Sequence, residues 1–322
     1  MDPIQTSVAM CTYNGSRYLR EQLQTIASQT RPPDELVICD DGSSDSTVSI
    51  LKEFAAQATF RVHVHVNENN MGPAKNFEKA IRLCRGEIIA LCDQDDIWNP
   101  QKLSRLLYIF EQNPNAIYAF SDAEMVDEEA APLAQKLWDA VGLRKSVGRF
   151  SGTGQLEILL RHNLIPGAAL AFRASYRDIL LPFPADWMHD YWIVLLGSTL
   201  SYGVPVNEPL FKYRRHAMQV CGWRKQTYLQ VLKTSLRTDP EKSWKKLEQF
   251  QKLLKRIDSV SEFALCHPEC LKLLRDKELH LSRRAKIRST TGVSRIASLF
   301  SEVKTGRYSR YSDSWQSIVR DL

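Results

Sequence analysis

The chain has 322 residues, of which 43% are hydrophobic and 25% are charged, which is a globular composition. No apolar run is long enough to span a bilayer, and the first residues have the features of neither a signal peptide nor a transit peptide. The seven cysteines form no regular framework, so we expect reduced thiols in a cytoplasmic protein.

The net charge of +6 is unevenly distributed. Residues 1–200 hold 18 Lys and Arg against 25 Asp and Glu, whereas residues 201–322 hold 25 against 12. The acidic part contains the carboxylate clusters described below. The basic part suits a phosphate, a nucleic acid or an anionic membrane face.

Short apolar runs alternate with helical stripes in the first part of the chain. The strands are predicted at residues 7–11, 36–39, 62–66 and 88–92, and apolar residues between them recur with helical spacing. This β-α-β-α-β-α-β order predicts an α/β fold, with a mostly parallel central sheet and helices on both faces.

Two of these strands run directly into carboxylates. Open α/β sheets bind ligands at this edge, and three crowded acids repel each other unless a cation or hydrogen-bond donors compensate them. The spacing Asp93-x-Asp95 suits a hard divalent ion that also binds substrate phosphates. A helix cap before Asn99-Pro100 would need only one of the acids. The acids are Asp40 and Asp41 after the second strand, and Asp93, Asp95 and Asp96 after the fourth.

Two further patterns resemble parts of metal sites. His63 and His65 alternate with valines on one strand, and we favour a polar, solvent-facing side over half a metal site. Cys266-His267-Pro268-Glu269-Cys270 has no evident fourth ligand, so we favour a turn between helices over a zinc site.

The middle of the chain is less regular. We expect an irregular insertion at residues 129–150, a strand at 168–172, a helix opening near Asp186 and a final pair of strands at 204–213. We place the domain boundary between residues 222 and 223, where alternating strand and helix patterns give way to basic amphipathic ones.

The region 223–322 is predicted to form basic amphipathic helices. One stripe begins at Trp244 and another at Ile296. Two interpretations stay open: helices packed on the catalytic domain, or helices bound to an anionic membrane surface. The first stripe contains Trp244, Leu247, Phe250, Leu253, Leu254, Ile257 and Val260, and lysines and arginines such as Lys242, Lys245, Lys252 and Lys255 cover much of the rest of that helix.

Residues 6–222 resemble a family 2 glycosyltransferase with a GT-A fold, in particular the rhamnosyltransferase-like enzymes of bacterial surface polysaccharide assembly. Each motif is weak alone, but their order and spacing are specific. In the last motif the family often has Gln where this chain has Arg215, which puts the contacts of that loop in doubt. The motifs are Thr12-Tyr13-Asn14-Gly15, Asp40-Asp41-Gly42-Ser43-Ser44-Asp45, Asn70-Met71-Gly72-Pro73-Ala74-Lys75-Asn76-Phe77, Asp93-Gln94-Asp95-Asp96-Ile97-Trp98, His189-Asp190 and Tyr213-Arg214-Arg215-His216.

The resemblance implies specific roles for these residues. Asp190 would be the catalytic base, although an Asp at a helix start is also expected without any function because it suits the helix dipole. Asp95, Asp93 and His216 would hold Mg²⁺ or Mn²⁺. The nucleotide-sugar donor would contact Thr12, Tyr13, Asn14, Asp40, Asp41, Lys75, Asp93, Gln94 and Arg214.

We therefore expect a metal-dependent, inverting glycosyltransferase that acts on a glycan or lipid-linked glycan, in the cytoplasm or at the inner face of the membrane. A nucleotidyltransferase is the alternative enzyme, and it usually needs a Gly-rich, basic loop at the first strand, where this chain has Thr12-Tyr13-Asn14-Gly15. A P-loop ATPase is excluded because no Gly-x-x-x-x-Gly-Lys-Ser/Thr occurs. A non-catalytic, membrane-binding adaptor is the other alternative; aromatic residues do not interleave with the basic ones as in a stacking platform, so we expect no nucleic-acid partner.

Overall fold

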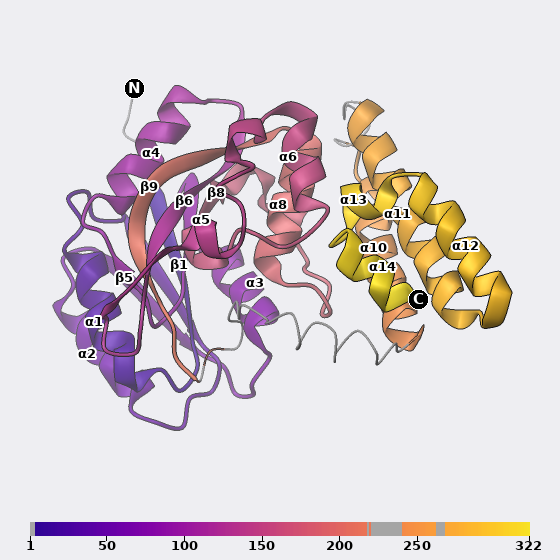
Figure 1. The fold of residues 1–322 in the computed structure, drawn as a ribbon. Helices are drawn as coiled ribbons and strands as arrows, with labels where there is room; N and C mark the ends of the chain where they lie inside the picture. The colour runs from indigo at the N-terminus through magenta and orange to yellow at the C-terminus, as the bar shows by residue number, and fades with distance from the viewer. Residues whose placement is uncertain (1–3, 218, 220–239, 262–267) are drawn as a thin grey trace. The chain divides into compact units, whose positions relative to one another are not determined.

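The computed structural model describes residues 4–217, 219, 240–261 and 268–322 (Figure 1). The chain divides into two compact units. The first unit comprises residues 1–150, 164–197 and 201–222, and the second comprises residues 151–163, 198–200 and 223–322. The domain boundary proposed from the sequence lies outside the described residues.

The first unit contains a nine-stranded sheet within the described residues, in the order β3-β2-β1-β4-β8-β6-β9-β5, with β7 beside β6. β3, β2, β1 and β4 are parallel, as the alternating pattern predicts. β8 is antiparallel to β4 and β6, and β5 is antiparallel to β9, so the sheet is mixed and contains more antiparallel pairs than expected. The strands are β1 (Thr6–Thr12), β2 (Glu35–Asp40), β3 (Arg61–Val66), β4 (Ile88–Cys92), β5 (Ile97–Trp98), β6 (Ala116–Val126), β7 (Pro132–Lys136), β8 (Leu170–Arg173) and β9 (Tyr202–Arg214).

Helices surround this sheet and bury their apolar sides (Figure 1). In α3, for example, Pro73 occupies the start of the helix and Phe77, Ala80 and Ile81 are buried at helical spacing. The helices are α1 (Ser16–Ala27), α2 (Thr47–Gln57), α3 (Pro73–Leu83), α4 (Lys102–Gln112), α5 (Leu137–Ala140), α7 (Arg177–Leu180) and α8 (His189–Leu200), with 3₁₀ turns η1 (Val147–Arg149), η2 (Gly167–Ala169) and η3 (Ala174–Tyr176).

The register of the parallel strands brings the predicted motifs together. β1 lies between β2 and β4, with Thr12 opposite Asp40 and Met10 opposite Cys92. All three strands end at the same edge of the sheet because they are parallel. The turn after β1 and the acid clusters after β2 and β4 therefore meet.

Two segments differ from their sequence-based expectations. The insertion at 129–150 contains β7 and α5, and β7 pairs with β6. The segment 204–213 belongs to one continuous strand, β9, instead of a pair of strands. Pro209 lies where the register with β6 shifts, and a proline without an N–H interrupts a ladder without reversing the chain.

The second unit is helical, and α10 buries its apolar stripe. Leu247, Phe250, Leu253, Leu254 and Ile257 are each at most 5% exposed. The described residues include no helix that is long and apolar enough to cross a membrane. The helices of this unit are α6 (Gly152–Leu159), α10 (Pro240–Ser259), α11 (Pro268–Ser289), α12 (Gly292–Lys304), α13 (Arg307–Tyr311) and α14 (Trp315–Asp321).

The cysteines that the structure describes are free, in agreement with the expected reduced thiols. Cys11, Cys39, Cys84, Cys92 and Cys270 are free. Residues 266 and 267 of the zinc-like pattern lie outside the described residues.

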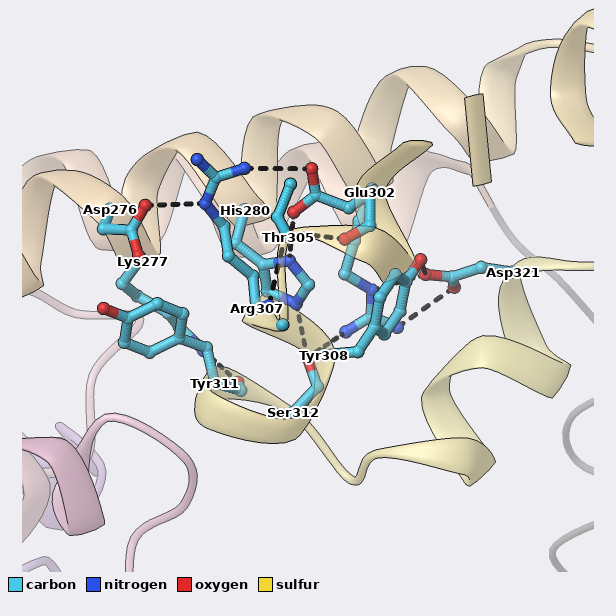
Figure 2. Close-up of polar contacts among 12 residues, drawn as sticks. Asp276, Lys277, His280, Glu302, Thr305, Arg307, Tyr308, Tyr311, Ser312 and Asp321 are labelled. Atoms are coloured by element: carbon cyan, nitrogen blue, oxygen red, sulfur yellow. Dashed lines mark hydrogen bonds and ion pairs between the residues drawn. The ribbon is translucent and has the colours of Figure 1, made fainter. Parts of the chain in front are cut away.

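A buried polar network joins the helices of the second unit (Figure 2). His280 Nδ1 lies 2.8 Å from Glu302 Oε1, and its Nε2 lies 2.7 Å from Ser312 Oγ. Asp321 Oδ2 accepts a 2.6 Å hydrogen bond from the Tyr308 hydroxyl. Such networks fix one arrangement of helices, because a misplaced helix would leave buried polar groups unpaired.

Lys277 in this network predicts a pH dependence of stability. Its Nζ donates to Tyr311 O at 2.8 Å, and burial lowers the pKa of Lys277 to about 7 from 10.5. Between these pH values the unfolded chain holds a proton that the folded chain releases, so the Lys277 contribution to stability rises with pH. We expect Lys277→Met to be more stable than the wild type at pH 7, with a difference that shrinks by about 2 kcal/mol when the pH rises by about two units.

Differential scanning calorimetry of the full chain at both pH values measures this difference. Lys272→Met is the matched control, because Lys272 is an exposed lysine on the same helix. A Lys277→Met difference that stays constant with pH would contradict the assignment.

Candidate active site

One cleft of about 680 Å³ lies at the carboxyl edge of the sheet in the first unit. It is lined by the turn after β1, the loop after β4 at residues 93–96 (the acid loop), the first residues of α3 and α8, and the segment after β9. The structure thus brings together most of the site residues predicted from the sequence. Those that line the cleft are Thr12, Tyr13, Asn14, Asp41, Asp93, Gln94, Asp95, Asp190 and His216.

Three predicted donor-binding residues are engaged with protein groups and are absent from the cleft lining. Asp40 is buried and accepts hydrogen bonds from Thr12 Oγ1 at 2.7 Å and from Ser43 N at 2.8 Å. Lys75 Nζ donates to Glu78 at 2.7 Å and to the Phe183 carbonyl at 2.9 Å. These side chains hold neighbouring segments in place.

Arg214 is the third of these residues. Its buried guanidinium donates to Asp95 O at 2.8 Å and to Glu128 O at 2.6 Å, and it pairs with Glu21. It also lies over the Tyr18 ring, 4.6 Å from the centroid. Arg214 therefore ties the acid loop to the segments that flank the cleft.

The turn after β1 is clamped to the acid loop by Gln94. The Gln94 side chain accepts from Tyr13 N at 2.9 Å and donates to Tyr13 O at 3.1 Å. A Cβ on Gly15 would lie 2.1 Å from Gln94 Oε1, so glycine at this position leaves room for the Gln94 side chain. The clamp couples the turn after β1 to the loop after β4.

Asp41 lines the cleft while it holds the loop before α3. Its carboxylate accepts from Asn67 Nδ2 at 2.9 Å, Met71 N at 2.8 Å and Gly72 N at 2.9 Å. Gly72 has φ of 79°, a conformation that favours glycine. These contacts shape the wall of the cleft next to the β1 turn.

The acid loop concentrates negative charge at the cleft. Burial, followed by the charges of Asp95 and Asp190, raises the pKa of Asp93 to about 7. Burial also raises the pKa of Asp96 well above its usual value, and Asp96 Oδ2 has no hydrogen-bond partner among the described residues. The loop therefore favours a cation or a proton.

Lys102 is a cationic neighbour of this loop that the sequence analysis missed. Its Nζ donates to Ala168 O at 2.5 Å and lies 4.2 Å from the ring centroids of both Trp98 and Phe211. Burial lowers the pKa of Lys102 to about 8, while the charges of Cys92, Asp96 and Asp93 oppose this shift. A lysine at the first residue of a helix is disfavoured by the helix dipole. This unusual position was the feature of the sequence that could have pointed to Lys102.

Asp95 and His216 form a pair at the cleft. His216 Nε2 lies 2.8 Å from Asp95 Oδ2, and the His216 ring packs on Tyr18 with centroids 4.9 Å apart. The described residues contain no group of three or more Asp, Glu, His or Cys side chains that could hold a metal alone. The donor set fits a different kind of site, in which one or two protein ligands share Mg²⁺ or Mn²⁺ with substrate phosphates and water.

Asp190 lies in the first turn of α8 and lines the same cleft. Its Oδ2 accepts from Gly167 N at 3.1 Å, and its Oδ1 accepts from Tyr191 N at 2.6 Å. These two N–H groups orient the carboxylate at the edge of the cleft. The geometry is suitable for a base, because the carboxylate is oriented and borders the cleft.

His189, next to Asp190, is a second residue whose environment the sequence did not reveal. Its ring stacks on Phe77 with centroids 4.0 Å apart, and neither ring nitrogen has a hydrogen-bond partner among the described residues. Burial lowers the pKa of His189, so the imidazole is neutral. A Cβ on Gly167 would lie 2.7 Å from His189 Nε2.

Gly167→Ala tests this packing. We expect turnover to fall by about tenfold or more, because the methyl group displaces either the His189 ring or the Gly167 N–H that orients Asp190. Gly148→Ala is the control, because a Cβ there meets no atom within 4 Å. Steady-state turnover and melting temperature of both variants provide the comparison, and an unchanged kcat in folded Gly167→Ala would contradict the expected role.

Known proteins share this fold and these sequence features. A family model described as Glycosyl transferase family 2 matches residues 7–180. An uncharacterised glycosyltransferase of Nostoc is 32% identical over 219 residues, which cover 66% of this chain and 65% of that protein. The chain spans 59% of the length of three mycobacterial proteins that it also matches.

Two solved structures show a similar GT-A fold. Staphylococcus aureus TarS 1–349 in complex with UDP-GlcNAc has a TM-score of 0.57 and 16% identity, and the match covers 95% of this chain and 82% of TarS 1–349. A Pyrobaculum calidifontis mannosyltransferase in complex with GDP-Man and Mn²⁺ has a TM-score of 0.53 and 16% identity, and the match covers 99% and 84% of the two chains. The fold, the acid loop at the sheet edge and the family match together identify this chain as a member of glycosyltransferase family 2.

Proposed function

We propose that the chain is a metal-dependent, inverting glycosyltransferase that moves a sugar from a nucleoside-diphosphate donor to a hydroxyl of a glycan or lipid-linked glycan in surface polysaccharide synthesis. The supporting observation is that one cleft is lined by the β1 turn, the acid loop and Asp190. In this proposal the β1 turn would hold the nucleoside, the acid loop would face the diphosphate, and Asp190 would face the acceptor hydroxyl.

The residues in this proposal have separate tasks. Tyr13 and Asn14 line the side of the cleft that would hold the base, and Asp41 shapes its wall. Asp95 and His216 would hold the divalent ion, with Asp93 beside them. A bound ion would neutralise charge that develops on the leaving diphosphate.

Asp190 would take the proton from the acceptor hydroxyl as that oxygen attacks the anomeric carbon. The bond from this carbon to the diphosphate breaks as the new glycosidic bond forms. A single displacement with one base inverts the anomeric configuration. The N–H groups of Gly167 and Tyr191 would orient Asp190 for this task.

The bound ligands of the structural neighbours support the donor class. TarS was solved with UDP-GlcNAc, and the mannosyltransferase was solved with GDP-Man and Mn²⁺. We extend to this chain only the shared chemistry of a nucleoside-diphosphate sugar and a divalent ion. A hexose donor is proposed, with rhamnose as the first candidate because of the motif resemblance.

A donor screen tests the proposal. UDP-, GDP- and dTDP-sugars, each with MnCl₂, are added to the full chain and the melting temperature is measured. We expect one nucleotide class to raise the melting temperature in the presence of Mn²⁺ and less in EDTA, because the ion would bridge the protein and the diphosphate. If none of these donors shifts the melting temperature, the proposed activity is wrong.

A further inference from the structure

Helix α12 of the second unit exposes large apolar side chains to solvent. Val293 is 83% exposed, Ile296 is 47% exposed and Phe300 is 63% exposed. Their spacing places them along one face of the helix. Leu299 and Val303 follow Ile296 at spacings of three and seven residues, so they lie beside this row, and they pack in the core of the unit. The unit therefore covers only part of the apolar stripe of this helix.

The structure distinguishes α12 from α10 as a candidate for membrane binding. The sequence pattern allowed this role for both helices. The apolar stripe of α10 is buried within the unit from Leu247 to Ile257, and Trp244, at 38% exposure, is its exposed large apolar side chain. Figure 1 shows α12 beside α11. Among the described helices of this unit, α12 is the one with three exposed large apolar side chains along one face.

The exposed charge on α12 itself is positive. Its acidic residue, Glu302, is 3% exposed and bonds to His280 and Arg307, so the exposed surface of α12 carries no carboxylate. Lys304 ends the helix and is exposed, and Lys286 is exposed near the end of α11. In the described part of residues 240–322, the exposed cations are Lys242, Lys245, Lys246, Lys252, Lys255, Lys272, Arg275, Arg283, Lys286, Lys304 and Arg310, and the exposed acids are Glu241, Glu248, Asp258 and Glu269.

We propose that Val293, Ile296 and Phe300 form an insertion ridge that binds the interfacial layer of an anionic lipid bilayer. An apolar ridge inserts between lipid chains, and flanking cations attract anionic headgroups. Ser294 and Ser298, between the ridge positions, and Ser301, directly after them, are exposed as well. The core of a protein–protein interface is instead depleted in lysine, so the exposed lysines favour lipid over a soluble partner.

Vesicle co-sedimentation of the full chain tests this surface. The probes are phosphatidylcholine vesicles and mixed phosphatidylcholine–phosphatidylglycerol vesicles. We expect the wild type to bind the mixed vesicles and to lose binding as salt rises, because the cations act through screened attraction. The triple variant Val293→Ser, Ile296→Ser, Phe300→Ser should bind them about tenfold or more weakly, because the buried apolar area is lost.

Matched variants keep the test specific. Tyr108→Ser and Leu133→Ser remove exposed apolar side chains of the first unit, at 49% and 40% exposure, and should leave vesicle binding unchanged. Lys286→Glu with Lys304→Glu should weaken binding to the mixed vesicles while leaving the ridge intact. Melting temperature and donor turnover of each soluble variant establish that it is folded, independently of lipid.

Three results would overturn the proposal. The wild type fails to bind either vesicle, the triple variant binds as the wild type does, or the triple variant converts an oligomer into a monomer without loss of vesicle binding. The last result would identify a second copy of the chain as the occupant of the ridge. Donor turnover without vesicles reports on the sugar-transfer proposal alone, so the two proposals fail separately.

Discussion

Asp190→Asn is expected to lower kcat by about 10²–10⁴-fold while donor affinity stays close to that of the wild type. Asparagine preserves the size of the side chain and can still accept from Gly167 N, but it cannot take a proton. Asp190 is 6% exposed and its two oxygens accept from Gly167 N and Tyr191 N, so asparagine keeps one of these hydrogen bonds and loses the other. A melting temperature close to that of the wild type would assign the loss to the chemical step.

The measurement is kcat and donor KM from nucleotide release, together with the donor-induced shift in melting temperature. Asp186→Asn is the control: an exposed Asp four residues upstream that is absent from the cleft lining. If Asp190→Asn loses donor binding while its remaining kcat is near normal, Asp190 binds the donor and is not the base.

Asp95→Ala is expected to remove the activation by Mn²⁺ and to lower kcat/KM by about 100-fold. The variant removes one of two side chains that face each other at 2.8 Å, and it leaves His216 as a single ligand. The remaining activity should respond little to added Mn²⁺ or to EDTA. His216→Ala should produce a smaller loss in the same direction, because a carboxylate is the stronger ligand for a hard ion.

Titration of Mn²⁺ into metal-free protein, with nucleotide release as the readout, measures both variants. His63→Ala and His65→Ala are the controls. They lie on β3 and are absent from the cleft lining, so they also test the alternative metal site that the sequence left open. An unchanged Mn²⁺ response in Asp95→Ala would contradict the proposed metal site.

The fold could be predicted from local patterns where the chain is simple. The runs Ser7–Cys11 and Ile88–Cys92 are short, apolar and followed by turn or acidic residues, and they form β1 and β4. Once these strands are parallel, their carboxyl ends must meet. That topology predicted that Tyr13 and Asp93 lie close to each other.

Neighbouring residues with the same side chain could not be distinguished in this way. Asp40 and Asp41 are adjacent, but successive side chains of a strand point to opposite sides. Asp40 bonds to Thr12 and Ser43, while Asp41 lines the cleft and holds the loop at Met71 and Gly72. The side-chain partner of Asp41, Asn67, lies more than 25 residues away in the sequence, so no local pattern distinguishes Asp41 from Asp40.

Other features depend on long-range packing as well. Lys102 is placed by Trp98, Phe211 and Ala168, and His189 is placed by Phe77 and Gly167. No local pattern contains these combinations. The amphipathic patterns of α10 and α12 were both visible in the sequence, but only the structure shows which apolar side is covered.

The most direct test of the central claim is nucleoside-diphosphate release from the best donor of the screen, with Mn²⁺ and acceptor, by the wild type, Asp95→Ala and Asp190→Ala in parallel. The account predicts turnover by the wild type and loss of turnover by both variants, with donor binding retained in Asp190→Ala. Turnover that stays intact in both variants would show that this cleft does not carry out the reaction.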